Sequence, residues 1–172
     1  SVVVSSLVHC AGVLNMMPVK MTTPELLNYT MNVNFFSFTQ LIKTLINRKV
    51  NNSKLRAVVV ISSTASKFGV KALSMYSASK GALDAYLRCL AVELAPDVRL
   101  NSILPGPIHS EMTERIFIDQ EFANKMESTY PLGFGKAADI ANLVEFLISD
   151  RSSWMTGQQV IIDGGKSINI SG

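Results

Sequence analysis

The stretch that decides the fold runs from Ala57–Ser63 (AVVVISS) to Tyr76–Lys80 (YSASK). Residues 57–61 form an apolar, β-branched run that predicts a buried strand, and a helix is expected to begin near Tyr76. On that helix Tyr76 and Lys80 are four residues apart, so they project from one face with Cβ atoms about 5–6 Å apart. Ser63 follows the strand at the end where open α/β sheets place their ligands. The pattern therefore predicts three polar groups at one sheet edge.

A phenol beside an ammonium group is suited to proton transfer. Tyrosine has a reference pKa of about 10 and is a poor base at neutral pH. A neighbouring cation favours the phenolate and lowers that pKa, which makes the pair a usable proton shuttle. A tyrosine and a lysine four apart are also common on solvated helix faces, and for the pair alone that is the better interpretation. The serine at the end of the preceding strand favours the catalytic one.

Ser63, Tyr76 and Lys80, with the spacing between them, resemble the catalytic signature of the classical short-chain dehydrogenase/reductase family. The resemblance covers nearly all of the chain. It implies an α/β fold with a Rossmann-like doubly wound parallel sheet in three layers, formed by residues 1–172 as a single domain. These residues resemble the C-terminal two thirds of the family fold. No glycine-rich phosphate loop precedes the first expected strand, so we expect the fold to be incomplete at its N-terminal side.

The remaining elements are read from apolar patterning and from helix start and stop signals. Thr23-Pro24-Glu25 is a helix start, and the helix is expected to run to about Asn47 with Leu27, Asn34, Leu41 and Leu45 near one face. Strands are expected at 2–9, 57–61 and 98–104, a closing strand and turn at 156–165, and further helices at 76–94 and 137–149. Strands that alternate with helices predict a parallel sheet covered on both faces and joined by right-handed crossovers.

Two further stretches carry the cofactor-binding expectations, and both could also be ordinary turn chemistry. His9-Cys10-Ala11-Gly12 resembles the family's Asn-Asn-Ala-Gly stretch, with His9 and Cys10 departing from the two asparagines. Pro105-Gly106-Pro107 resembles the Pro-Gly motif that passes the nicotinamide ring. The resemblance implies that the cofactor is bound by Cys10, Ala11, Gly12, Tyr76, Lys80, Pro105, Gly106, the backbone at Ile108 and the hydroxyl of Ser110.

The resemblance also assigns catalytic roles. Tyr76 is implied to be the acid/base, and Lys80 to lower its pKa and hold the nicotinamide ribose. Ser63 is implied to bind the substrate oxygen. Asn34 is implied to hold a water in the proton relay; it could equally be a partly exposed asparagine or one bonded to a neighbouring carbonyl. The cofactor is NAD or NADP, because the residue that distinguishes the two lies in the part of the family fold that these residues do not match.

Two classes of function are left open. One is an NAD(P)-dependent oxidoreductase acting on a carbonyl or alcohol, such as a 3-oxoacyl-thioester reductase or a sugar or polyol dehydrogenase. The other is a catalytically silent fragment that acts only through subunit contacts. Residues 111–130 contain apolar side chains that predict a substrate with an apolar portion: Met112, Ile116, Phe117, Phe122 and Met126.

Composition limits the remaining classes. A hydrophobic share of 48% with 17% charged residues is typical of a folded globular protein. The net charge of +3 is not gathered into a long basic run, so a nucleic-acid partner is not expected, and no apolar run reaches the ~18 residues of a membrane helix. Cys10 and Cys89 have no metal-ligand spacing and are expected to be buried thiols. We expect a cytoplasmic homodimer or homotetramer.

Overall fold

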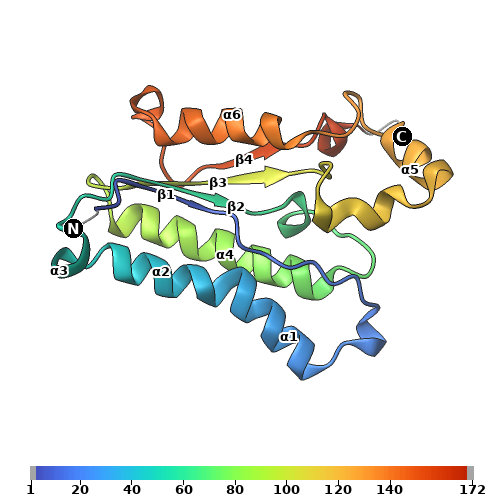
Figure 1. Cartoon of the computed structure of the whole chain (residues 1–172), viewed down its shortest axis with the longest axis horizontal. Coiled ribbons are helices and arrows are strands. Elements are labelled where there is room, and N and C mark those ends of the chain that lie inside the picture. The colour runs from blue at the N-terminus through green and yellow to red at the C-terminus, as the bar shows by residue number, and fades with distance from the viewer. Residues whose placement is uncertain (1–2, 170–172) are drawn as a thin grey trace.

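The structure is a computed structural model that describes residues 3–169, without the side chains of residues 115–117. A four-stranded parallel sheet in the order β1-β2-β3-β4 forms its centre. The strands are β1 (Ser6–His9), β2 (Ala57–Ile61), β3 (Arg99–Pro105) and β4 (Gln159–Ile162). Their carboxyl ends point to the same edge of the sheet (Figure 1). Of the expected first strand, Val2 lies outside the described residues, and the strand itself begins at Ser6.

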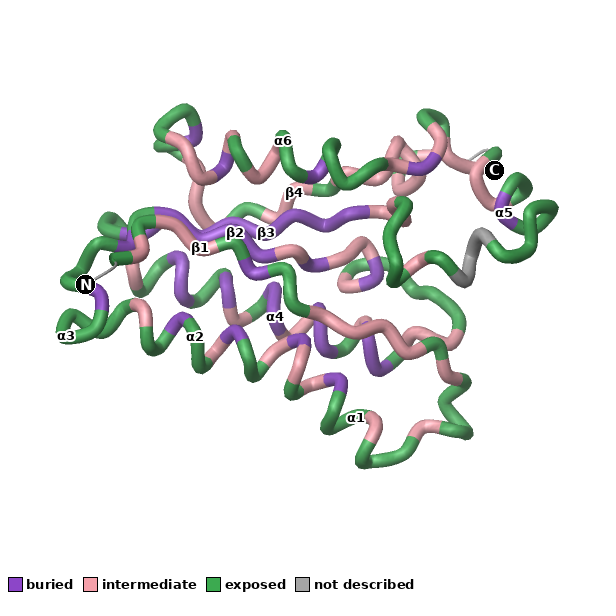
Figure 2. Tube along the Cα trace, viewed as in Figure 1, coloured by how far each residue is buried: buried purple, intermediate pink, exposed green. Residues whose placement is uncertain are grey.

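Helices cover both faces of this sheet. One face carries α1 (Pro24–Met31), α2 (Ser37–Leu45) and α4 (Ser74–Glu93), and the other carries α6 (Ala137–Ile148) (Figure 1). Val58 and Val60 pack toward α2 and α4, while Val59 packs toward α6. Buried residues accordingly run along the central strands and the facing sides of the helices (Figure 2). The predicted three-layer α/β arrangement is confirmed, because a parallel sheet must bury both faces.

One connection crosses the sheet with the opposite hand to the other two. The chain passes from β1 to β2 and from β2 to β3 over the α2–α4 face, and from β3 to β4 by α6 over the other face. Each strand is parallel to the last and is added on the same side of it, so connections over opposite faces have opposite hands. The expectation of right-handed crossovers throughout is therefore wrong. The apolar face presented by Val59 and Ile103 needs a cover, and α6 provides it.

The long helix expected from Thr23 to Asn47 is interrupted. It begins as predicted, with the Thr23 hydroxyl accepting from the Leu26 amide, and α2 ends at Leu45. Between α1 and α2 lies a π-helical turn, η2 (Asn32–Phe36). The buried positions of this segment are spaced by four residues: Thr30, Asn34, Phe38 and Ile42.

This spacing overturns the expected helix face. An α-helix repeats every 3.6 residues, so a strict spacing of four drifts around it unless an extra residue is inserted, which the π turn does. Leu27 and Leu41, expected on one face with Asn34, are each 38% exposed, whereas Asn34 is completely buried.

Shorter elements complete the chain. They are η1 (Val19–Met21), α3 (Arg48–Asn51), η3 (Thr64–Ser66), η4 (Glu111–Phe117), α5 (Gln120–Glu127), η5 (Asp150–Ser152) and η6 (Lys166–Ile168). Among the described residues, no helix is long and apolar enough to cross a bilayer.

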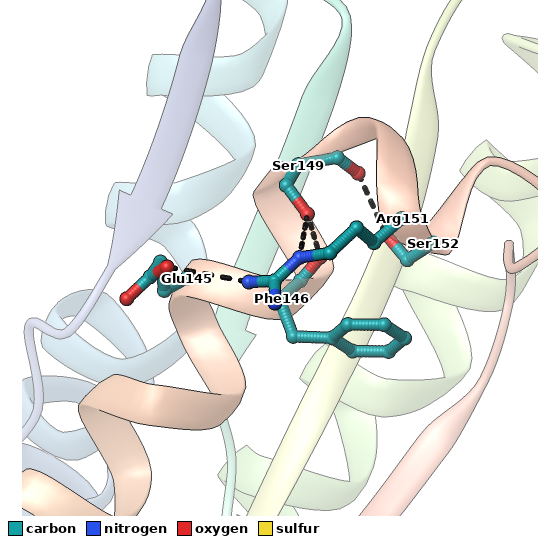
Figure 3. A network of polar contacts seen from close by, with 5 residues as sticks. All are labelled: Glu145, Phe146, Ser149, Arg151 and Ser152. Carbon is teal, nitrogen blue, oxygen red and sulfur yellow. Dashed lines mark hydrogen bonds and ion pairs between the residues drawn. The ribbon is translucent and has the colours of Figure 1, made fainter.

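Hydrogen bonds tie the C-terminal end of α6 to the sheet. The Arg99 guanidinium, on β3, donates to the carbonyls of Leu147 and Ser149, each at 3.0 Å. Arg151 reaches back across Ser149 toward Glu145, with its guanidinium over the Phe146 ring (Figure 3). The Arg151–Glu145 pair is largely exposed and should contribute at most about 1 kcal/mol. Arg99 is therefore the main anchor between α6 and β3.

Two buried asparagines fix the segment that contains β1. Before the strand, the Asn51 side chain accepts from the Val4 amide and donates to the Val4 carbonyl, both at 2.7 Å. After the strand, the Asn34 side chain makes the same pair of bonds with Val13, at 2.7 and 3.0 Å. Each asparagine side chain bonds both the N–H and the C=O of one valine, as a neighbouring strand would do. The two ends of the segment are therefore held in place.

Candidate active site

Tyr76 and Ser63 meet at the carboxyl edge of the sheet. Ser63 follows β2 and caps η3, where its hydroxyl accepts from the Ala65 amide at 3.1 Å. Tyr76 lies in the first turn of α4 and is 8% exposed, and the Ser63 side chain is near enough to its phenol to act against the rise in its pKa. The phenol that the sequence singled out is thus turned inward, toward the end of β2, and away from bulk solvent.

Lys80 lies one helical turn further along α4 and is 3% exposed. Its ammonium donates to the carbonyl of Ile61 at 2.8 Å and stands 5.8 Å from the centre of the Tyr76 ring. Burial lowers the pKa of Lys80 from 10.5 to about 8, against the opposing charges of Asp84 and Cys10. Close to neutral pH the group is still a cation, held directly behind the tyrosine.

The electrostatics of Tyr76 differ from the expectation. Burial raises the pKa of Tyr76, and the effect that opposes this rise is the hydrogen bond from Ser63 rather than the charge of Lys80. Burial therefore outweighs any lowering of the tyrosine pKa by Lys80, and the net shift is upward. The reason is that Lys80 faces the ring and directs its proton to Ile61, while the phenolic oxygen faces Ser63.

Gly12 brings the chain after β1 against the same group. A Cβ atom on Gly12 would lie 3.3 Å from the Lys80 Nζ and 3.5 Å from the Asn34 Oδ1. A contact of 3.3 Å is tighter than a methyl group normally makes. The absence of a side chain at this position therefore lets Asn34, Lys80 and the backbone of Gly12 share one small volume.

Asn34 is completely buried, and its side chain is engaged by protein partners. Besides its two bonds to Val13, it donates to the Ser79 hydroxyl at 2.9 Å, and Ser79 donates to the Tyr76 carbonyl at 2.7 Å. Both amide protons of Asn34 are thus in use. Of the interpretations left open by the sequence, the one with a bonded carbonyl describes the side chain, and a water relay would have to use another atom of the residue.

At the end of β3, the candidate cofactor-binding residues Pro105 and Gly106 contact other parts of the protein. A Cβ atom on Gly106 would lie 2.9 Å from the Cβ of Asp163, so packing against the C-terminal segment already accounts for the glycine. Pro105 is buried at the end of β3, and its carbonyl accepts from Thr64 at 3.2 Å. Each of these residues has a packing role that needs no ligand.

Ile108 and Ser110 are held in the same way. Ile108 pairs with Gly135, and its carbonyl accepts a hydrogen bond from the Thr113 hydroxyl. Ser110 is exposed, and its hydroxyl lies 3.1 Å from that of Thr113, where it caps η4. The implied contacts of Ile108 and Ser110 with a nicotinamide are therefore not visible in the geometry and stay predictions.

Cys10 and Ala11 are exposed at the carboxyl edge, beside the Lys80 ammonium, which partly offsets the burial that raises the pKa of the Cys10 thiol. The expectation that Cys10 and Cys89 are buried is wrong, since both are exposed. Cys10 lies just beyond the last paired residue of β1, where the sheet opens to solvent, and Cys89 lies on the outer side of α4. Among the described residues no cluster of three or more His, Cys, Asp or Glu could hold a metal ion.

Sequence reasoning missed three buried groups around Lys80. His9 is 5% exposed, its Nε2 lies 3.2 Å from the Ser37 hydroxyl, and burial and the Lys80 charge lower its pKa. Ser79 links Asn34 to Tyr76, and Asp84 is a carboxylate only 3% exposed. A signal for Asp84 was present in the sequence, since it is four residues from Lys80 on the same helix face.

The arrangement can support proton transfer. A hydroxyl and a phenol lie near each other at a sheet edge, and a buried cation stands behind the phenol. A substrate oxygen that met both hydroxyl groups could receive a proton from Tyr76 and a hydrogen bond from Ser63, which is the geometry that general acid catalysis needs.

Comparisons with known proteins show to which family the chain belongs. Residues 3–167 match a family model described as enoyl-(acyl carrier protein) reductase. The chain is 31% identical over 164 residues to carbonyl reductase (NADPH) 2 of Sus scrofa, covering 94% of this chain and 67% of the relative. It is 32% identical over 164 residues to L-xylulose reductase of Bos taurus, with coverage of 94% and 67%. To a chloroplastic tropinone reductase homolog of Arabidopsis thaliana it is 36% identical over 141 residues, which is 81% of this chain and 44% of the relative.

Solved structures share the fold. A 4-hydroxyisoleucine dehydrogenase complexed with NADH superposes with a TM-score of 0.89 at 29% identity, over 95% of this chain and 68% of that one. The chain thus spans about half to two thirds of the length of the curated relatives described above. The match over residues 3–167, and relatives above 30% identity, show that the chain belongs to the classical short-chain dehydrogenase/reductase family.

Proposed function

We propose that the protein is an NAD(P)-dependent oxidoreductase that transfers a hydride between nicotinamide and a carbonyl or alcohol substrate. The observation that carries this proposal is the buried Tyr76 side chain, with Ser63 acting on its phenol and the Lys80 ammonium 5.8 Å from the centre of its ring. The relatives support it, since one is a carbonyl reductase of NADPH and another was solved with NADH.

The residues at the carboxyl edge fit a nicotinamide cofactor on the side of Gly12. There the backbone carries no Cβ atom, and the nearest groups are the Lys80 ammonium and the Asn34 oxygen. Lys80 and Tyr76 would hold the ribose, with Cys10, Ala11 and Gly12 beside it. Pro105, Gly106, Ile108 and Ser110 would lie along the nicotinamide. When bound, the cofactor supplies or accepts the hydride.

Each residue of this chain then has a defined task. In the direction of reduction, Tyr76 donates its proton to the substrate oxygen, and Ser63 donates a hydrogen bond to that oxygen as negative charge develops there. The phenolate left on Tyr76 is stabilised by the Lys80 cation. Asn34 fixes the Gly12–Val13 segment and, through Ser79, the first turns of α4. Oxidation runs the same proton transfer in reverse.

The substrate is proposed to be a small molecule with an apolar portion. Met112 in η4 and Phe122 in α5 are 44% and 56% exposed and could adapt to such a group. The side chains of Ile116 and Phe117 lie outside the described residues. The family model favours an acyl thioester, whereas the relatives are named for carbonyl, tropinone and xylulose reduction.

The test is a cofactor-linked assay of the full-length protein. NADH and NADPH are supplied in turn with a 3-oxoacyl thioester, a cyclic ketone and a ketose, and nicotinamide absorbance is followed; the matching alcohols are then offered with the oxidised cofactors. Turnover of at least one of these substrates, lost in Ser63→Ala, is the expected result. Cofactor binding by fluorescence without turnover of any substrate in either direction would contradict the proposal and favour a catalytically silent protein.

A further inference from the structure

Asp84 is a buried acid that the mechanism above does not use. It lies on α4 and is 3% exposed, and neither of its carboxylate oxygens has a hydrogen-bond partner among the described residues. An ionised carboxylate without a partner is costly to bury, and such groups usually have a compensating cation nearby. The position therefore calls for a physical reason.

Lys80 is the cation that meets this need. It is four residues before Asp84 on the same helix, so the two side chains leave one face of α4, and both are 3% exposed. The Asp84 charge favours the protonated form of Lys80 and opposes the burial that lowers the pKa of the lysine. Among the described residues the two groups form no ion pair within 4.0 Å, so the charge of Asp84 acts on Lys80 across a longer distance along the same helix face.

Within the part of the chain that the structure describes, Asp84 forms no ion pair, and the face of α4 that carries it lies toward neutral groups of the sheet. Ala91, seven residues further along the same helix face, lies against Gly157, where an added Cβ would be 3.5 Å from the Ala91 Cβ. That face of α4 therefore looks onto the β3–β4 side of the sheet, where Ser102 pairs in register with Gln159. The Ser102 hydroxyl and the Gln159 amide nitrogen are buried and also lack a partner among the residues described. Both groups are neutral.

The charged and titratable groups around this pair are few. Lys80 itself faces Tyr76 on α4, His9 at the end of β1, and Cys10 after it. On the elements packed against α4, the other such groups are exposed or otherwise bonded: Glu25, Tyr29, Lys43, Lys67 and Arg99. On α4 itself the rest are Tyr86, packed on Phe35 and Phe38, and the exposed Arg88, Cys89 and Glu93.

We propose that Asp84 is a positioning residue whose carboxylate is the counter-charge that keeps Lys80 an ammonium in the site. Its part in catalysis rests on the function proposed above, while its effect on Lys80 does not. Without the carboxylate, Lys80 loses its proton at lower pH. The Tyr76 phenolate then has no cation behind it over the upper part of the working range.

The test compares Asp84→Asn, which keeps the shape and removes the charge, with Asp84→Glu, which keeps the charge. Glu93→Gln is the matched control, because it removes an exposed acid from the same helix, about 20 Å from Lys80 at 1.5 Å per residue. The full-length protein is labelled with lysine-Nζ nitrogen-15, the Lys80 signal is assigned with Lys80→Arg, and its titration is followed by NMR.

The titration midpoint of Lys80 is expected to fall by about one pH unit in Asp84→Asn, to be restored in Asp84→Glu and to be unchanged in Glu93→Gln. The alkaline limb of kcat/KM is expected to move in the same direction, with little change near pH 6. An unchanged Lys80 titration in Asp84→Asn would overturn the proposal.

If Asp84→Asn does not fold, a second neutral variant, Asp84→Ser, is measured in its place. If neither neutral variant folds, Asp84 is a folding determinant and the proposal is overturned. A shifted Lys80 titration in a wild-type protein that turns over no substrate would leave the charge coupling intact and would refute only the proposed function.

Discussion

Asn34 and Asn51 make the same contact at opposite ends of β1, and their comparison separates what the fold requires from what the site requires. Each buried side chain pairs with both backbone groups of one residue, Val13 in one case and Val4 in the other. At the amino edge, the Asn51 side chain has this structural pairing alone among the described residues. At the carboxyl edge, Asn34 also holds Ser79 and stands beside Lys80, within a π-helical turn.

The shared geometry shows that pairing with the backbone is a structural task. It needs an asparagine at each end of β1, whatever lies nearby. What is particular to the carboxyl edge is the cluster behind the pairing, formed by Tyr76, Lys80 and the bare backbone of Gly12. Matched variants of Asn34 and Asn51 can therefore separate an effect on protein stability from an effect on enzyme activity.

The largest effect is expected for the pair Asn34→Ala and Asn51→Ala. Each leaves a partly buried N–H and C=O without partners, and a loss of about 3 kcal/mol in unfolding free energy is expected for both. Only Asn34→Ala should also reduce turnover at temperatures where the protein stays folded. Denaturant unfolding and the cofactor-linked assay measure the two effects. An equal loss of activity in Asn51→Ala would contradict the claim that only Asn34 also supports the site.

Gly106→Ala tests whether the β3 side of the edge is structural. The added Cβ would meet Asp163 at 2.9 Å, so a loss of about 1–3 kcal/mol in stability is expected. Gly69→Ala is the control, because no described atom lies within 4 Å of the place that a Cβ atom would take there. If both alanine variants melt at the wild-type temperature, packing against Asp163 does not explain this glycine.

Lys80→Met tests the buried cation through the pH dependence of stability. The folded-state pKa of Lys80 is about 8 and its ordinary value is 10.5, so between these limits the unfolded chain binds more protons than the folded one. Stability contributed by this group therefore rises with pH across that window, by up to about 1.4 kcal/mol per pH unit.

The difference in unfolding free energy between wild type and Lys80→Met should accordingly grow from pH 8 to 10.5. Lys67→Met, at an exposed position, is the control and should run parallel to wild type. Parallel curves for Lys80→Met would mean that the lysine is not held at a depressed pKa.

Ser110→Ala has the smallest expected effect. Its hydroxyl caps η4, so stability should fall by no more than about 1 kcal/mol. If the hydroxyl also meets the nicotinamide, the KM for cofactor rises several-fold while kcat changes little, and Ser110→Thr restores it. An unchanged cofactor KM in the alanine variant would leave Ser110 with the capping role alone.

Much of this architecture follows from local pattern. The strand at 57–61 matches the prediction to the residue, and the helix from Ser74 to Glu93 lies within two residues of it. Both segments combine long apolar runs with clear boundaries. The shared position of Tyr76 and Lys80 could be predicted from the sequence, because residues four apart on a helix project from the same face.

What the sequence did not reveal depends on contacts between distant segments. The π turn at Asn32–Phe36 contains Asn34, which bonds to the distant Val13, and no local propensity encodes such a contact. The position of α6 on the far face is set by apolar residues of β2 and β3. The isolation of the Asp84 carboxylate becomes visible only when the β3–β4 side of the sheet is in place.

The central claim is that Tyr76 is the proton donor of a hydride-transfer site, and Tyr76→Phe tests it most directly. Tyr29→Phe makes the same chemical change at a tyrosine 52% exposed on α1. Single-turnover reduction by pre-bound cofactor is expected to slow by about 10²–10⁴ in Tyr76→Phe, with unchanged cofactor Kd, and to be unaffected in Tyr29→Phe. A wild-type rate in Tyr76→Phe would contradict the account.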